Sequence, residues 1–225
     1  MTLSVAYSAT MNNDLIRLIA GFRRFKERYF AQDGAEHTLY ERLASSGQTP
    51  KTLLIGCSDS RVDPAILTDA SPGELFVVRN VANLVPPCEI SAVGFHGTSS
   101  AIEFAVKSLK VENIIILGHR QCGGIRALMN GVTETDSFIG QWMTIAEEAR
   151  QCVLHDHPEA DDETKYRLAE MESLRVSRKN VLSFPFVKDA MDKQNLTVLC
   201  IYFDLELGEL WYFDDTHSNF REVKL

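Results

Sequence analysis

The sequence predicts an α/β fold: a mostly parallel central sheet with flanking helices, an antiparallel edge hairpin near the C-terminus and an N-terminal helical arm. Three features indicate this class: short unbroken apolar segments, a helical segment between two of them, and two late strand-like segments around a glycine. The 225 residues are 45% hydrophobic and 24% charged, which suits one sizeable core. We therefore expect a single domain over residues 1–225, with the arm (residues 1–35) included in it.

The arm is predicted from residues 13–30, which place apolar side chains at helical spacing. Leu15, Ile19 and Phe22 begin this series, and most basic residues lie on the other face. An amphipathic helix of this kind packs either on its own domain or on a second subunit, and packing on its own domain is the commoner arrangement.

The parallel strands are predicted at residues 52–56, 74–79 and 113–118, which are short and rich in apolar or β-branched residues. Strands without polar alternation are typical of sheets covered on both faces. Residues 97–110 combine a Ser/Thr cluster with one apolar face, so we expect a crossover helix between the second and third strands.

The C-terminal part is predicted to contain helices and then a hairpin. Residues 137–193 are charged and helical in pattern, with an acidic loop at residues 154–163. Residues 197–214 form two strand-like segments around a tight turn at Leu207 and Gly208. The hairpin should close one edge of the sheet.

Charge and cysteine content restrict the partners and the compartment. The formal net charge of -8 and the isoelectric point near 5.3 argue against nucleic acid or an anionic membrane as partner. No segment has the ~20 consecutive apolar residues of a membrane span, and none has the pattern of an export signal. Five cysteines at irregular spacing indicate free thiols or metal ligands in a reducing compartment, so we expect a cytoplasmic protein.

Metal-binding side chains follow two of the predicted strands. Cys57 follows the first strand, and His119 and Cys122 follow the third, at a glycine-rich helix start. Because the carboxyl ends of parallel strands meet at one edge of the sheet, these side chains can converge there. One imidazole and two thiolates suit Zn²⁺, and three protein ligands leave the fourth position to water, as in catalytic zinc sites.

The other thiols are weaker candidates for a fourth ligand. Cys200 lies in an apolar strand, Cys152 in a helical region and Cys88 in a proline-flanked loop. Small buried cysteines are common core residues, so we expect none of these three on the metal.

Asp59 and Arg61 follow the first cysteine closely. An Asp-x-Arg pair is usually a surface ion pair worth ~0–1 kcal/mol. Beside a metal, however, an arginine that holds the aspartate by two hydrogen bonds would keep it ionised and ready to accept a proton. Alternatively, the carboxylate could rotate onto the metal and expel the water. Asp63 and Pro64 should cap the next helix, which makes the loop short.

The segments "CSDSRVDP", "VVRNVANLVPP" and "GHRQCGGI", in this order and separation, resemble a β-class carbonic anhydrase, most strongly over residues 45–130. The resemblance implies Zn²⁺ bound by Cys57, His119 and Cys122, and a catalytic pair of Asp59 and Arg61. It implies a lyase that hydrates carbon dioxide reversibly to bicarbonate and a proton by attack of zinc-bound hydroxide. It also implies a homodimer as minimal unit, often paired into a homotetramer, with each site near the subunit interface.

The residues around the metal distinguish two subtypes of this family. The bacterial subtype with an inhibitory bicarbonate pocket has a tryptophan, an arginine and a tyrosine where this sequence has Leu54, Arg79 and Phe203. Two of these three side chains are therefore absent. For this reason we expect Asp59 to stay off the metal at neutral to alkaline pH.

The plant-like subtype fits better. Its glutamine and apolar pocket residues are matched by Gln48, Phe76 and Val81, whereas its usual tyrosine is replaced by Phe104. The apolar side chains would exclude water from carbon dioxide, and Gln48 and the Gly123 N–H would bind its oxygens. Loss of the tyrosine hydroxyl removes one polar group from this pocket.

Two other functions use some of the same residues. Attack on carbon disulfide or carbonyl sulfide needs the same metal and a similar linear substrate, so a hydrolase of these compounds is one alternative. A non-catalytic, zinc-stabilised binding module is the other; it predicts four protein ligands and no role for a positioned Asp59–Arg61 pair.

Overall fold

The computed structural model describes residues 12–30, 38–89, 96–131 and 137–224. The chain divides into two compact units, Met1–Gln48 and Thr49–Leu225. Each is described by itself, and the expected single domain over residues 1–225 stays a prediction. No helix in the described ranges combines the length and the apolar character needed to cross a bilayer.

The first unit contains the predicted helix of the arm, α2 (Asn13–Phe30), and a shorter helix, α3 (Leu39–Ser46). No residue of α2 is buried. The helices meet through aromatic rings: Tyr40 of α3 has ring centroids 5.1 Å from Phe25, 5.5 Å from Tyr29 and 5.3 Å from Phe30. These contacts account for the aromatic residues at the end of α2.

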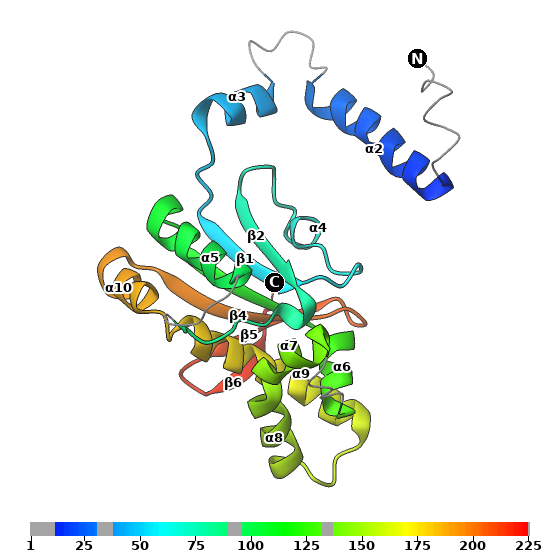
Figure 1. Cartoon of the computed structure of the whole chain (residues 1–225), viewed down its shortest axis with the longest axis vertical. Coiled ribbons are helices and arrows are strands. Elements are labelled where there is room, and N and C mark those ends of the chain that lie inside the picture. The colour runs from blue at the N-terminus through cyan, green and yellow to red at the C-terminus, as the bar shows by residue number, and fades with distance from the viewer. Residues whose placement is uncertain (1–11, 31–37, 90–95, 132–136, 225) are drawn as a thin grey trace. The chain divides into compact units, whose positions relative to one another are not determined.

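The second unit is built around one six-stranded sheet with the order β2-β1-β3-β4-β5-β6 (Figure 1). The pairs β1–β2, β1–β3 and β3–β4 are parallel, and β4–β5 and β5–β6 are antiparallel. The strands are β1 (Thr52–Cys57), β2 (Leu75–Asn80), β3 (Asn113–His119), β4 (Thr197–Asp204), β5 (Glu209–Asp214) and β6 (Asn219–Glu222). The mostly parallel sheet and its C-terminal hairpin are thus confirmed, whereas β6 was not predicted.

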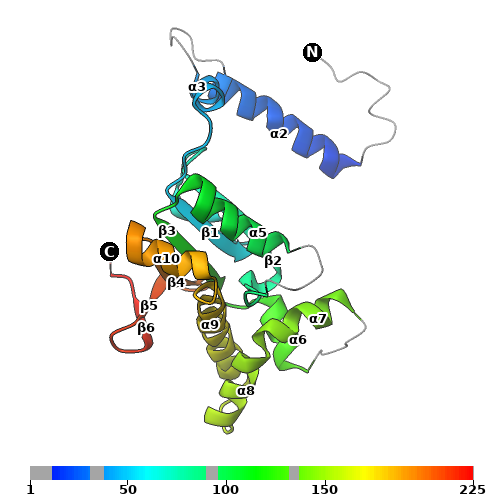
Figure 2. The ribbon, with the colours of Figure 1, turned by 60° about the vertical axis from the view of Figure 1, so that its left-hand side comes forward.

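Helices connect the strands and cover the sheet, as Figures 1 and 2 show from two sides. They are α4 (Pro64–Thr68), η1 (Val81–Asn83), α5 (Gly97–Glu103), η2 (Phe104–Leu109), α6 (Gly123–Met129), α7 (Phe138–Met143), η3 (Thr144–Ala146), α8 (Glu147–Asp156), α9 (Asp162–Val181) and α10 (Pro185–Gln194). The predicted crossover helix is α5 continued by the π-helical turn η2. Asp63 caps α4 through the N–H groups of Ala65 and Ile66, with Pro64 at its first position, as expected.

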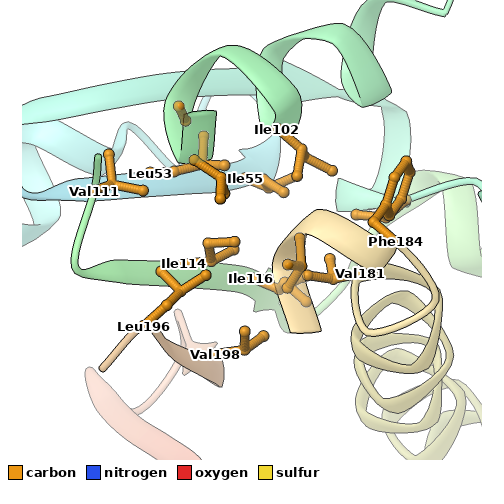
Figure 3. Close-up of a cluster of buried hydrophobic side chains, with 14 of the residues drawn as sticks. Leu53, Ile55, Ile102, Val111, Ile114, Ile116, Val181, Phe184, Leu196 and Val198 are labelled. Carbon is orange, nitrogen blue, oxygen red and sulfur yellow. The ribbon is translucent and has the colours of Figure 1, made fainter. Parts of the chain in front are cut away.

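The main hydrophobic core lies between one face of the sheet and the helices α5, η2, α9 and α10 (Figure 3). Leu53 and Ile55 of β1 and Ile114 and Ile116 of β3 are fully buried there. On the other face, the buried Leu54 and Leu117 pack with side chains such as Ile115, Ile201 and Phe203, which are only half-buried. The expected burial on both faces is therefore complete on one face and partial on the other.

The sheet order places β1 directly beside β3, with Gly56 opposite Leu117 in the parallel register. Both strands end within a few residues of this pair, β1 at Cys57 and β3 at His119. The adjacency of these two strands brings the predicted ligand residues together at one edge of the sheet.

We predict that Ile116→Ala destabilises the protein by about 2–5 kcal/mol, because it removes a fully buried side chain from the central strand and leaves a cavity. The free energy of unfolding, measured by chemical denaturation, tests this. Ile66→Ala is the control: Ile66 is 83% exposed, so the change should stay within about 0.5 kcal/mol. Equal losses in the two variants would contradict the assignment of the core.

Candidate metal centre

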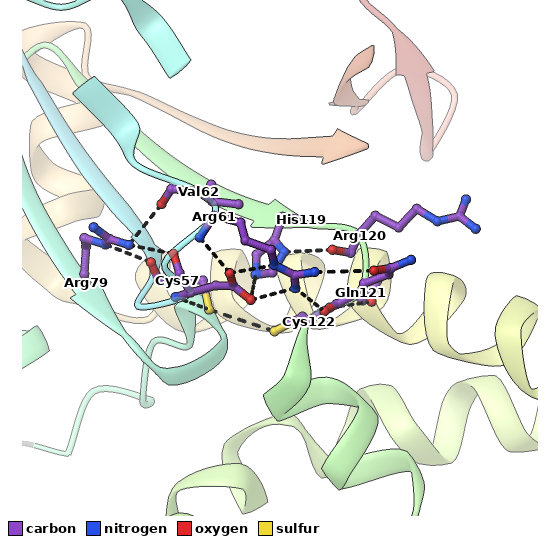
Figure 4. Close-up of polar contacts among 10 residues, drawn as sticks. Cys57, Arg61, Val62, Arg79, His119, Arg120, Gln121 and Cys122 are labelled. Atoms are coloured by element: carbon purple, nitrogen blue, oxygen red, sulfur yellow. Dashed lines mark hydrogen bonds and ion pairs between the residues drawn. The ribbon is translucent and has the colours of Figure 1, made fainter. Parts of the chain in front are cut away.

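Cys57, His119 and Cys122 come together in one buried cluster (Figure 4). Their ligand atoms all lie within 4.8 Å of one another, and the three residues are 5%, 1% and 1% exposed. Cys57 ends β1, His119 ends β3, and Cys122 immediately precedes α6. Within the described part of the chain, this is the one group of His, Cys and acidic residues arranged to hold a metal ion.

The remaining cysteines lie elsewhere, as the sequence indicated. Cys200 is buried in β4, where its thiol donates to the carbonyl oxygen of Leu174. Cys152 lies in α8 and contacts Asp156, and Cys88 is half-buried outside the helices and strands. None of the three joins the cluster among the residues that the structure describes.

A tight turn after β3 brings Cys122 back beside His119. The N–H of Arg120 donates to the Phe203 carbonyl at 2.9 Å, so the chain still follows β4 at that residue. Gln121 then takes a left-handed conformation with φ of 57°, which is uncommon for a residue other than glycine. This turn sets Cys122 at the start of α6.

The donor atoms fit a tetrahedral zinc ion. The two sulfur atoms are 4.0 Å apart, close to the separation of about 3.8 Å between thiolates that each lie about 2.3 Å from one tetrahedral ion. The Nδ1 of His119 lies 2.8 Å from the carbonyl oxygen of Arg120, to which it can donate. In that tautomer, Nε2 carries the lone pair, and Nε2 is buried with no hydrogen-bond partner among the described residues.

The two thiols influence each other's ionisation. Hydrogen bonding from Cys122 lowers the pKa of Cys57, with the His119 side chain and the Asp59 N–H adding to the effect. The same contact raises the pKa of Cys122, because ionising it would place a second negative charge beside the first. Two thiols that share one proton in this way can release it when a dication binds to both sulfurs.

Asp59 and Arg61 form the predicted pair beside the cluster. The Arg61 side chain donates to both carboxylate oxygens of Asp59, at 3.0 and 2.8 Å, and also to the Gln121 carbonyl at 3.0 Å. These hydrogen bonds hold the pKa of Asp59 well below its usual range. One Asp59 oxygen lies 3.9 Å from the unpartnered Nε2 of His119. An ionised acceptor thus stands next to the place that a metal would occupy.

Arg79 holds the loop that carries these residues, a role that the sequence reasoning missed. Its side chain donates to the carbonyl oxygens of Cys57, Asp59 and Val62, at 2.9, 2.8 and 3.0 Å (Figure 4). A further contact reaches the Asp63 carboxylate at 3.3 Å. The sequence places Arg79 near the end of a predicted strand. Only the pairing of β2 with β1 shows that its side chain can reach the loop after Cys57.

Two of the expected pocket residues lie near the cluster. Gly123 directly follows Cys122, and a Cβ added to it would meet no atom within 4 Å. Gly124 is packed closely: an added Cβ would lie 3.0 Å from both the Val81 Cγ1 and the Ala82 Cβ. Val81 is 40% exposed and so forms an open wall beside the start of α6.

Of the other expected pocket residues, Phe76 and Phe104 belong to the second unit and Gln48 belongs to the first. Phe76 and Phe104 contact each other, with ring centroids 5.9 Å apart. Phe76 pairs with Leu53, four residues before Cys57, so it lies about 13 Å back along the strands. Gln48 is exposed at the end of the first unit. The role of these three residues stays a prediction.

We predict that Gly124→Ala lowers the free energy of unfolding by about 1–3 kcal/mol, because its Cβ would force Val81 or Ala82 to move. Gly123→Ala is a matched control in the same helical turn, with open space around the new methyl group. Chemical denaturation of both variants checks the difference. If the two glycines tolerate alanine equally, the close packing at Gly124 is wrong.

The sequence and fold match known proteins over most of the chain. A family profile described as "Carbonic anhydrase" matches residues 52–210, which include all three cluster residues. Beta carbonic anhydrase 3 of Arabidopsis thaliana is 36% identical over 204 residues, covering 88% of this chain and 77% of that protein. A carbonic anhydrase of Synechocystis sp. is 33% identical over 206 residues, covering 91% and 73%.

Solved structures agree with these matches. The β-carbonic anhydrase CcaA superposes with a TM-score of 0.85 and 31% identity, covering 95% of this chain and 94% of that one. A tetrameric β-carbonic anhydrase from the ascomycete Sordaria macrospora superposes with a TM-score of 0.77 and 25% identity, covering 95% and 98%.

Proposed function

Because this chain belongs to the β-carbonic anhydrase family and is therefore a lyase, we propose that it hydrates carbon dioxide reversibly with Zn²⁺ held by Cys57, His119 and Cys122. One observation carries the proposal most directly. The unpartnered Nε2 of His119 and two sulfurs 4.0 Å apart point to one position, beside which Asp59 is held by Arg61. The three protein ligands and this pair favour an enzyme over a non-catalytic zinc module.

Zinc bound by these three residues would act as a Lewis acid that makes a water molecule acidic enough to react near neutral pH. The remaining work falls to the chain's own side chains. Asp59 would accept a hydrogen bond from the attacking oxygen and orient it, for which it must stay ionised. Arg61 keeps it ionised and fixes its orientation through two hydrogen bonds. Arg79 keeps the loop in place through its three carbonyl contacts.

The substrate would lie against Val81 and the backbone of Gly123. Carbon dioxide is small and apolar, so an apolar wall that excludes competing water suits it, and the Gly123 N–H offers a donor to one oxygen. We further propose that Gln48, Phe76 and Phe104 complete the pocket of a second subunit. The distance of Phe76 from Cys57 in one chain and the 44% exposure of Phe104 support this assignment.

A homodimer is accordingly the proposed working unit, with a tetramer as the larger assembly. The tetrameric Sordaria macrospora relative supports an oligomer. None of the five cysteines is paired in a disulfide, which supports a reducing compartment, and we propose the cytoplasm.

We predict that the purified protein binds one Zn²⁺ per chain and accelerates carbon dioxide hydration, and that a chelator abolishes both. Metal analysis and stopped-flow hydration with a pH indicator measure these properties. Restoration of activity by added zinc is the control for chelator damage. A metal-free protein, or one that turns over carbon disulfide or carbonyl sulfide but not carbon dioxide, would contradict the proposal.

We predict that Asp59→Asn lowers kcat by roughly 10²- to 10⁴-fold while the zinc content stays near one per chain, because the amide lacks the charge that makes the carboxylate a strong hydrogen-bond acceptor for the attacking oxygen. Asp189→Asn serves as the control; Asp189 is an exposed residue of α10, paired only with Lys193 in the described contacts. Full hydration activity in the Asp59 variant would exclude the proposed role.

A further inference from the structure

A buried carboxyl group on α9 reaches the backbone of one metal-ligand candidate. Glu170 is 3% exposed, and its Oε1 accepts a hydrogen bond from the Cys122 N–H at 2.9 Å. Its Oε2 accepts a hydrogen bond from the Tyr202 hydroxyl of β4 at 2.8 Å, and Tyr202 is fully buried. Glu170 therefore joins three elements: α9, the turn before α6, and β4.

We propose that Glu170 is a positioning residue, which fixes the backbone of Cys122 and so holds the Cys122 sulfur in place for zinc. This inference rests on the proposed function, since it concerns the same metal centre.

The turn that carries Cys122 needs a hydrogen-bond acceptor such as Glu170. Gln121, just before it, adopts a left-handed conformation, and Cys122 itself is extended with φ of -68° and ψ of 117°. The Cys122 N–H precedes the hydrogen-bonded turns of α6, so the helix provides no acceptor for it. Without Glu170 this donor would be buried and unsatisfied, and the turn could rotate to find another acceptor. Such a rotation would displace the sulfur.

The other two ligand candidates are held in a comparable way. The Cys57 carbonyl accepts a hydrogen bond from Arg79 at 2.9 Å, and the His119 ring lies against the Arg120 carbonyl at 2.8 Å. Outer partners of this kind orient metal ligands, and their loss typically weakens metal binding about 10- to 100-fold. Glu170 supplies the third such contact.

Burial of the Glu170 carboxylate costs desolvation free energy, which argues that Glu170 has a specific role. Removal from water raises its pKa to about 7, despite the two hydrogen bonds that favour the ionised form. An apolar side chain in the same place would avoid this desolvation cost, but it would leave both donors unpaired.

Two substitutions of Glu170 distinguish the effect of its hydrogen-bond position from the effect of its negative charge. Glu170→Gln keeps the length and places an amide oxygen where it can accept the Cys122 N–H, but it removes the charge. Glu170→Asp keeps the charge and is one methylene shorter, so it cannot reach both donors. We expect Glu170→Gln to bind zinc within about threefold of the wild type, and Glu170→Asp to bind it about 10- to 100-fold more weakly.

Zinc affinity would be measured by competition with a chromophoric chelator, on protein whose folding is checked by circular dichroism. Excess zinc should restore the hydration activity of Glu170→Asp, which a purely structural defect would not allow. Glu172→Asp is the matched control: Glu172 is two residues further along α9, is half-buried and pairs with Arg175 instead. Its zinc affinity should equal that of the wild type.

The outcomes are distinct. Wild-type affinity in folded Glu170→Asp, or a greater loss in Glu170→Gln than in Glu170→Asp, would overturn the positioning role. A loss in Glu172→Asp as large as in Glu170→Asp would also overturn it, since it would reflect general damage to α9. Failure of the wild-type protein to bind zinc would instead refute the proposed function itself.

Discussion

The structure depends on the burial of two sulfur atoms and an imidazole within 4.8 Å of one another, at the carboxyl ends of two adjacent strands. Burial alone disfavours a thiolate, and two thiolates side by side repel each other. The cluster therefore needs either a shared proton or a dication. The contact between the Cys57 and Cys122 sulfurs allows them to share a proton. The unpartnered Nε2 of His119 is suited to binding a dication.

Around this cluster, the fold supplies a contact for each group that must not move. Arg79 holds the loop after β1, and the Arg120 carbonyl orients His119. Arg61 binds Asp59 and also reaches the turn at Gln121, so it links the loops that follow β1 and β3. Exposed ion pairs usually contribute little to stability. The Arg61–Asp59 pair matters instead because it fixes the position of the Asp59 carboxylate beside the cluster.

The two faces of the sheet have different surroundings. Helices α5, η2, α9 and α10 seal one face, whereas Ile115, Ile201 and Phe203 on the other are only half-buried. The exposed Val77 and Phe104 add further apolar surface to this unit. The proposed dimer would bury apolar side chains of this kind against a second chain.

The sequence by itself determined the class of fold and selected the three residues that the structure brings together as candidate metal ligands. Unbroken apolar segments and a proline after Asp63 are local signals, so the strands and the start of α4 could be located within one or two residues. Cys57, His119 and Cys122 could be selected because they follow strands and because their chemistry suits zinc. Strand β6 has four residues, three of them polar, so it has no comparable signal.

The contacts that hold the centre were decided by the tertiary structure alone. Arg79 is 22 residues from Cys57 in the sequence, and Glu170 is 48 residues from Cys122. Hydrogen bonds over such separations depend on strand order and helix placement, which no local pattern encodes. Neighbouring residues specify a strand, but only the packing of distant segments specifies which buried donor meets which acceptor.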